Sequence, residues 1–371
     1  MKTESSLASG HIPGLDALRA IAVLLVAFQH WQPSSLGFVL LFGNTGVGCF
    51  FVLSGFLITA ILLKQRGKPF WPALLTFHWR RAVRIYPSYY ALNIALLAAG
   101  IPVAWETAGW NFTYTTNLYI FATAEWIGNL SHFWSLAVEF QFYLFWPFII
   151  LLTPAKWLGR VLAAIIVLST ATRLGFYFGG FGATQIKTFT LNYFDYFACG
   201  GLLAMPAVRE RLWSLRSLFN KLALACLALF VATGLARNSG LMDVEAAISI
   251  QLILLLVFTT QFVFLTTCES HQAAWKRLLN FAPLRYLGVI SYGFYLYHNL
   301  AGSFWKIVFE KLHMEEPGGI TRLALYFAWT TIVSVISYHG FEVFFLRLKS
   351  ISRKPAAADL TPCISHPKSA I

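Results

Sequence analysis

The sequence predicts an all-α fold: a polytopic membrane helix bundle with about ten transmembrane helices and both termini in the cytosol. Three observations lead to this prediction. Hydrophobic residues make up 58% of the 371 positions and charged residues only 12%, whereas soluble domains carry about a quarter charged residues. The 34 Phe, 13 Trp and 15 Tyr suit lipid contact and the headgroup boundary. Basic residues also gather between the apolar stretches. Together these features exclude a soluble enzyme, a disordered chain and a disulfide scaffold.

Ten apolar stretches approach the length of about 20 residues that a helix needs to cross a bilayer. They cover approximately residues 15–32, 40–63, 83–101, 133–153, 157–178, 189–207, 217–236, 246–267, 286–309 and 320–347. The third is the weakest, because Pro87 and Asn93 interrupt it. The sixth contains Asp195 and two glycines.

The orientation follows from the distribution of basic residues, which favour cytosolic loops. If the N-terminus lies in the cytosol, all but six of the 28 Lys and Arg residues lie on the cytosolic side, and the six exceptions are Arg173, Lys187, Arg237, Lys306, Lys311 and Arg322. The net charge of +13 is therefore explained by topology, and we expect membrane lipid and no nucleic acid as a partner. We assign residues 1–349 to one membrane domain and residues 350–371 to a short cytosolic tail.

Arg19 and His30 are the sharpest pair of ionisable residues in a predicted span. Eleven positions at about 100° and 1.5 Å per residue place them on nearly the same helix face, about 16 Å apart. Arg19 would lie near the cytosolic end of the span and His30 deep within it. A cation and an imidazole in these places suit an anionic cofactor whose reactive end reaches into the bilayer. Alternatively, Arg19 extends to the cytosolic surface and His30 caps a helix near Trp31.

Arg81 and Arg84 in HWRRAVRIYP are spaced to share a helix face. Guanidinium groups bind phosphates in a bidentate manner, although positive-inside topology alone also produces a basic run. Glu139 and Asp195 lie at similar depth in two spans, where a carboxylate orients a histidine, lines a polar cavity or binds another helix. His132 lies at the outer boundary, and we expect His132 and Asp195 to contact the acceptor.

Other features favour packing rather than chemistry. His298 and Glu342 are single polar residues in apolar spans, and we assign both to contacts between helices. The glycines of GNTGVGCFFVLSGFLIT do not precede a Lys-Ser/Thr pair, so they are not a phosphate loop. Small residues instead let membrane helices approach closely. The five cysteines form no Cys/His cluster, so no metal is expected.

Six segments, in order, resemble the membrane-bound acyltransferase type 3 family, whose members acylate sugars of surface polysaccharides. The segments are IPGLDALRAIAVLLVAFQH, GVGCFFVLSGFLIT, RRAVRIYPSYY, HFWSLAVEFQFYLFWP, DYFACGGLLA and LGVISYGFYLYHN. The resemblance runs from about residue 12 to residue 347. It matches Arg19 and His30 to the family's essential pair, and Arg81 and Arg84 to its Arg-x-x-Arg motif. Phe140 replaces the second acid that follows the family's glutamate, so only Glu139 is carried over.

The resemblance implies an O-acyltransferase that takes an acyl group, commonly acetyl, from cytosolic acyl-CoA and gives it to a glycan or lipid-linked sugar outside. Arg19, Arg81 and Arg84 would bind acyl-CoA, and His30 would act as general base or acyl carrier. Glu139 would orient His30 or the acceptor. The expected location is the inner membrane of a bacterium. Two alternatives are a glycolipid transporter or flippase and a scaffold subunit of a polysaccharide assembly complex.

Overall fold

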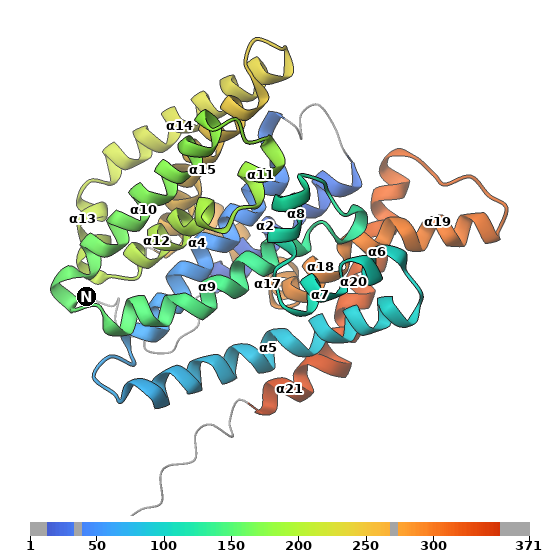
Figure 1. Cartoon of the computed structure of the whole chain (residues 1–371), viewed down its shortest axis with the longest axis horizontal. Helices are drawn as coiled ribbons and strands as arrows, with labels where there is room; N and C mark the ends of the chain where they lie inside the picture. The colour runs from blue at the N-terminus through green and yellow to red at the C-terminus, as the bar shows by residue number, and fades with distance from the viewer. Residues whose placement is uncertain (1–12, 33–38, 268–273, 349–371) are drawn as a thin grey trace, which may run out of the picture.

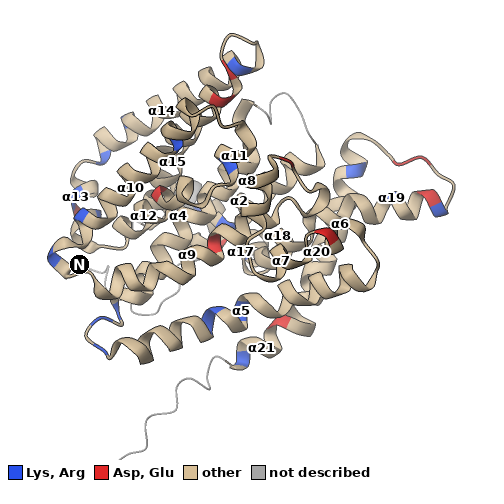
Figure 2. Cartoon of the chain, viewed as in Figure 1, with Lys and Arg blue, Asp and Glu red and all other residues tan. Residues whose placement is uncertain are grey.

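The structure is a computed structural model that describes residues 13–32, 39–267 and 274–348. All regular secondary structure in these ranges is helical (Figure 1). The predicted tail at 350–371 lies outside the described residues. Figure 2 shows that most of the ribbon carries neither an acidic nor a basic residue, as expected of a bundle built to contact lipid.

Seven helical stretches of the described chain are long and apolar enough to cross a membrane. They are Gly14–Trp31, Phe42–Leu63, Gly128–Leu152, Ala155–Phe178, Arg216–Asn238, Val244–Thr267 and Gly319–Arg347. Each coincides with one of the ten predicted spans. The helices concerned are α2 (Pro13–Trp31), α4 (Phe42–Leu63), α9 (Phe133–Leu152), α10 (Ala155–Phe178), α14 (Arg216–Asn238), α15 (Val244–Thr267) and α20 (Gly319–Ser337), with α21 (Val343–Arg347) continuing α20 after the π-helical turn η4 (Tyr338–Glu342).

The other three predicted spans are not single long apolar helices. In place of 83–101 the chain forms α5 (Phe70–Ala98), whose first half carries the basic run. In place of 189–207 it forms the 3-10 turn η2 (Thr190–Tyr193) and the ten-residue α12 (Phe194–Leu203). The third, 286–309, is broken into several short pieces, namely α17 (Ala282–Val289), α18 (Ser291–Tyr297), the 3-10 turn η3 (His298–Leu300) and α19 (Ala301–Lys311).

Short helices cover one end of the bundle and connect the longer ones. They are α6 (Pro102–Glu106), α7 (Ala108–Phe112), α8 (Thr116–Thr123), η1 (Gly128–Leu130), α11 (Ala183–Thr188), α13 (Pro206–Ser214) and α16 (Ala274–Leu279). Figure 1 shows α5 along the lower edge with α21 beside it, and α19 at the right of the view.

The core is formed where α4 contacts α2, α9, α12 and α15. Two glycines allow α4 and α12 to approach backbone to backbone. A Cβ on Gly55 would overlap the carbonyl oxygen of Phe197, and a Cβ on Gly200 would overlap that of Val52. The packing role expected for the glycines of α4 is therefore confirmed at Gly55. This tight centre fixes α4, which lines all three cavities described below together with α2 and α18.

Candidate functional site

Helix α2 carries Arg19 and His30 within one uninterrupted helix. Because the helix is continuous, the eleven-residue spacing gives a rise of about 16 Å between them. Arg19 lines two cavities at one end of this distance, and His30 lines a third cavity at the other. The same-face geometry predicted from the sequence is thus present.

Three cavities follow one another along α2 and α4. The vestibule is lined by Asp16, Arg19, Arg81, Arg84 and Glu342, among others. The basic cavity shares the three arginines with the vestibule and adds Ser54, Glu139 and Tyr143. The histidine cavity is lined by His30, His132, Lys187, Asn129 and Asn299, among others. Val47 and Tyr295 line both the basic and the histidine cavity, so these two cavities are direct neighbours.

The three neighbouring cavities form a row of space that is partly open to solvent. With this open space included, their volumes are about 1050 Å³ for the vestibule, 960 Å³ for the basic cavity and 900 Å³ for the histidine cavity. A molecule that is anionic at one end could therefore contact the arginines while its other end approaches His30.

The basic cavity gathers three arginines from two helices. Arg19 pairs with Asp16 at 3.1 Å. Within the described part of the chain, Arg81 and Arg84 form no ion pair with a carboxylate. The Nε atom of Arg81 is buried without a hydrogen-bond partner, and its guanidinium carbon lies 6.0 Å from the ring centroids of Phe77 and Tyr143. A half-buried guanidinium that lines a cavity and has no carboxylate partner among the described residues fits a phosphate or another anion.

Glu139 belongs to the basic cavity and is not a partner of His30. Its Oε1 accepts hydrogen bonds from Ser54 Oγ and Tyr143 Oη, both at 2.5 Å. The sequence analysis had Glu139 orient His30 or the acceptor. The structure separates Glu139 from the histidine, because α9 directs this carboxylate toward the arginines. The interpretation that a carboxylate at this depth lines a polar cavity agrees with the structure, but the side chains around Glu139 are not those expected.

The partner of His30 is a second histidine. His30 Nδ1 lies 2.8 Å from His298 Nε2, and the two rings stack with their centroids 5.0 Å apart. His298 is fully buried, and its Nδ1 lies 2.6 Å from the carbonyl oxygen of Tyr295. Trp31 Nε1 donates to the His298 carbonyl oxygen at 2.8 Å. His30 itself remains accessible in the histidine cavity.

His132 joins this group from the start of α9. Its Nε2 lies 3.1 Å from the carbonyl oxygen of Leu296, and its ring centroid lies 5.0 Å from that of His298. The Nδ1 atom is buried and has no hydrogen-bond partner among the described residues. The structure therefore brings His30 and His132 together in the wall of one cavity, as a shared substrate site requires.

Lys187, on α11, adds a cation to the histidine cavity, and none of the residues that line this cavity is acidic. Burial, and to a lesser degree the charge of Arg237, lower the pKa of Lys187 to about 8. The sequence analysis treated Lys187 only as an exception to the topology rule. A cation that lines the same cavity as His30, with no acidic residue in the wall, instead suits an anionic or strongly polar ligand.

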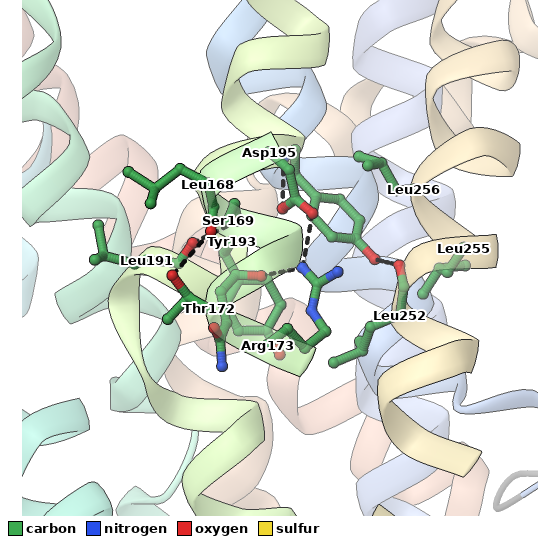
Figure 3. Close-up of polar contacts among 12 residues, drawn as sticks. Leu168, Ser169, Thr172, Arg173, Leu191, Tyr193, Asp195, Leu252, Leu255 and Leu256 are labelled. Atoms are coloured by element: carbon green, nitrogen blue, oxygen red, sulfur yellow. Dashed lines mark hydrogen bonds and ion pairs between the residues drawn. The ribbon is translucent and has the colours of Figure 1, made fainter. Parts of the chain in front are cut away.

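Asp195 does not contact this site. Its Oδ2 pairs with Arg173 Nη2 at 2.7 Å, and both side chains are fully buried. Asp195 Oδ1 also accepts from the backbone N–H of Tyr196 at 3.0 Å. Figure 3 shows Arg173 of α10 reaching this carboxylate. Arg173 Nη2 also donates to the backbone carbonyl oxygen of Asn192. The expected contact of Asp195 with the acceptor is replaced by a structural ion pair between α10 and α12.

His298 is the main residue whose place in the site the sequence analysis missed. It was assigned to helix packing as a lone polar residue in an apolar stretch. The signal that could have found it is its neighbourhood, since a histidine followed by asparagine in LYHN breaks an otherwise apolar run. Its pairing with His30 depends on the break between α18 and α19, which periodicity did not reveal.

Comparison with known proteins adds a family to this geometry. The model of an acyltransferase domain matches residues 12–339. The chain belongs to this acyltransferase family. The resemblance predicted from the six segments is thereby confirmed.

The curated relatives of this acyltransferase-family chain include two bacterial proteins matched over most of its length. It is 28% identical over 376 residues to the peptidoglycan O-acetyltransferase OatA of Listeria monocytogenes, covering 92% of this chain and 57% of the relative. It is 28% identical over 381 residues to the putative peptidoglycan O-acetyltransferase YrhL of Bacillus subtilis, covering 90% of this chain and 54% of the relative. The chain thus spans little more than half the length of these relatives.

A shorter match, 36% identical over 155 residues, covers 38% of this chain and 25% of a putative O-acetyltransferase of Staphylococcus aureus. No solved structure is significantly similar to the chain. The all-helical bundle with seven candidate spans and the relatives together indicate a multi-pass membrane protein.

Proposed function

We propose that the protein is an integral-membrane O-acyltransferase that moves an acetyl group from cytosolic acetyl-CoA to a hydroxyl of an exported glycan. The observation that carries the proposal is the row of three neighbouring cavities, with arginines at one end and His30 at the other. The relatives' names support acetyl as the acyl group and a peptidoglycan-like glycan as the acceptor. The proposed setting is the bacterial inner membrane, with the arginine end facing the cytosol.

The donor fits the residues of the basic cavity and the vestibule. Arg81 and Arg84 carry guanidinium groups without carboxylate partners among the described residues, and Arg19 stands beside them. These three side chains would bind the phosphates of acyl-CoA. The distance of about 16 Å along α2 would be bridged by the extended arm of the donor. Val47 and Tyr295 mark the passage into the histidine cavity.

The bound acyl thioester supplies the acyl group, and its sulfur leaves as the thiol. His30 removes the proton from the acceptor hydroxyl as the oxygen attacks the acyl carbon. The new C–O ester bond forms, the C–S bond breaks, and the proton held on His30 is passed to the departing sulfur. Polar side chains in the histidine cavity, including Asn129, His132 and Asn299, would hold the acceptor.

Transfer by the purified chain in liposomes tests the proposal. The assay combines acetyl-CoA with muropeptides, soluble peptidoglycan fragments, and measures both free CoA thiol and ester-linked acetyl on the glycan. Wild type should form both products in equal amounts. His30→Ala should reduce the rate by about 10²–10⁴-fold, the usual contribution of a general base.

The matched control is His339→Ala, because His339 bonds Tyr286 outside the three cavities. This variant should transfer acetyl at the wild-type rate. Equal rates for wild type and a folded His30→Ala protein would contradict the assignment of His30. Movement of intact glycan across the bilayer, without CoA release, would favour the transporter alternative instead.

A further inference from the structure

The hydrogen bonds around His30 form a directed chain that ends on a backbone carbonyl. A carbonyl oxygen only accepts hydrogen bonds. The 2.6 Å contact between His298 Nδ1 and the Tyr295 carbonyl oxygen therefore places a proton on His298 Nδ1. In a neutral imidazole the other nitrogen is then an acceptor. His298 Nε2 thus presents a lone pair to His30.

This lone pair fixes the proton of His30 in turn. The 2.8 Å contact joins His298 Nε2 to His30 Nδ1, so His30 Nδ1 carries the proton and donates it. A second proton on the pair would create a charge beside a cavity that has no acidic residue in its wall, which is unfavourable at a buried site. The neutral chain leaves His30 Nε2 as the unprotonated nitrogen.

We propose that His298 is a positioning residue that fixes His30 in the Nδ1-protonated tautomer, so that Nε2 is free to accept the hydroxyl proton. The inference rests on the proposed function for its chemistry, and on the hydrogen bonds alone for its tautomer. In many nucleophile–base–acid groups a carboxylate has this orienting role. Here a neutral imidazole, itself anchored on a carbonyl, takes that place.

The fold holds His298 firmly enough for this role. The side chain is fully buried, and the ring of His132 packs edge-on against it. Trp31, the residue after His30, bonds the His298 carbonyl oxygen. The 3-10 turn η3 begins at His298, and the ring nitrogen reaches back to the carbonyl three residues earlier. The break in the helix thus serves to direct one imidazole toward another.

The assignment also determines how charge develops during transfer. When His30 Nε2 takes the hydroxyl proton, the positive charge of the imidazolium is shared through Nδ1–H with the lone pair on His298. A hydrogen bond to a charged donor is stronger than one to a neutral donor. His298 therefore stabilises the protonated state of His30 that exists only during the reaction, which is the state that catalysis needs.

Three substitutions at His298 separate this role from a structural one. In His298→Gln the side-chain amide oxygen can reach the place of Nε2 and accept from His30, while the bond to Tyr295 is lost. His298→Asn has the opposite effect, since its shorter amide can donate to the Tyr295 carbonyl but cannot reach His30. His298→Ala loses both bonds.

In the liposome transfer assay, His298→Gln should retain kcat within about tenfold of wild type. His298→Asn and His298→Ala should lose about 10–100-fold, the range typical of residues that orient a functional histidine, with the KM for acetyl-CoA unchanged. If the only role of His298 were to anchor the fold through its bond to the Tyr295 carbonyl oxygen, the order would be reversed, with His298→Asn active and His298→Gln inactive. That order would overturn the proposal.

Nitrogen-15 NMR of histidine-labelled protein in lipid tests the tautomer without any turnover. Signals of His30 are assigned by their loss in His30→Ala. In wild type they should show a protonated Nδ1 and a bare Nε2, and in His298→Ala a mixture of tautomers. A wild-type His30 protonated at Nε2 would overturn the proposal. Absence of transfer by wild type would instead refute the proposed function, while the NMR result would still decide the tautomer.

Discussion

Arg173 and Arg81 are both arginines within the bundle, yet they have opposite surroundings. Arg173 is fully buried against Asp195 at 2.7 Å, one cation with one matched anion (Figure 3). Arg81 stands with Arg19 and Arg84 around a cavity and has no carboxylate pair among the described residues. Within the described chain, both guanidinium groups keep buried nitrogens without a hydrogen-bond partner, so the difference lies in the paired carboxylate and in the cavity. The first arrangement is closed, whereas the second is open toward a cavity.

The presence or absence of a paired carboxylate distinguishes an arginine that stabilises the fold from one that is available to bind a ligand. A buried charge must be paired or it destabilises the fold. Where the protein supplies the partner, as at Arg173, the pair joins α10 to α12. Where the described residues supply no carboxylate, as at Arg81 and Arg84, we propose that an anion from outside completes the site. The sequence placed Arg81 and Arg84 in a cytosolic basic run and Arg173 among the six basic residues on the other side, but it did not reveal that Asp195 pairs with Arg173.

The largest effect is expected from removing the carboxylate of the Arg173–Asp195 ion pair. Asp195→Ala leaves Arg173 buried without its anion, which should lower the free energy of unfolding by about 3–5 kcal/mol. The protein that remains folded should bind acetyl-CoA with unchanged affinity, because Asp195 lines none of the three cavities. Denaturation in detergent and a binding isotherm measure the two quantities. If the Asp195→Ala variant kept the stability of wild type but bound acetyl-CoA more weakly, Asp195 would belong to the binding site and not to a structural ion pair.

An intermediate effect is expected from removing either Arg81 or Arg84 from the basic cavity. Arg81→Ala and Arg84→Ala should each weaken acetyl-CoA binding by about 10–100-fold, since a hydrogen bond to a charged group contributes about 1.5–3 kcal/mol. The free energy of unfolding should change little or rise, because like charges are removed. Arg80→Ala, adjacent in sequence and outside the cavity linings, is the matched control. Donor affinity that stays constant in both variants would refute the phosphate site.

A smaller effect is expected at Glu139. Glu139→Gln keeps an acceptor for Ser54 and Tyr143 and removes only a negative charge from the basic cavity. The KM for acetyl-CoA should fall a few-fold as repulsion of the phosphates is relieved, with kcat nearly unchanged. Steady-state kinetics distinguish the two constants. A hundredfold loss of kcat with constant KM would restore Glu139 to a role in the chemistry.

The smallest effect is expected at Lys187, an unmatched cation in the histidine cavity. Its pKa is lowered to about 8 from the ordinary 10.5, by burial first and then by Arg237. Between these pH values the unfolded chain binds more protons than the folded one, so the stability of wild type should rise as the pH increases. Lys187→Gln lacks this dependence. Its stability advantage over wild type should therefore shrink from pH 7.5 to pH 10, and a constant difference would contradict the assignment.

The sequence predicted the parts of this molecule that depend on composition and local spacing. Seven of the ten expected spans are single long helices, and the eleven-residue spacing brought Arg19 and His30 to one helix face. Discontinuous elements were not predicted. The short α12 and the break at His298 place polar groups inside the bundle. These groups were not noticed because the hydropathy averaged over each stretch of sequence is still apolar.

Partners were also beyond the reach of the sequence. Asp195 was assigned to the acceptor because Arg173, 22 residues earlier, gave no local sign of pairing with it. His298 was assigned to packing because its contact with His30 spans 268 positions. Pairings of this kind arise from tertiary structure, so residue type and periodicity identified the candidates but not their contacts.

Sidedness of transfer tests the central claim most directly, because the proposed function has donor and acceptor enter from opposite faces of the membrane. Sealed proteoliposomes would receive acetyl-CoA outside, with the muropeptide acceptor either trapped inside or added outside. Only protein molecules inserted with the arginine end outward can use this donor, and those inserted the other way form no product in either arrangement. Acetylated glycan should form when the acceptor is inside and not when both substrates are outside. Equal product in the two arrangements would contradict the account.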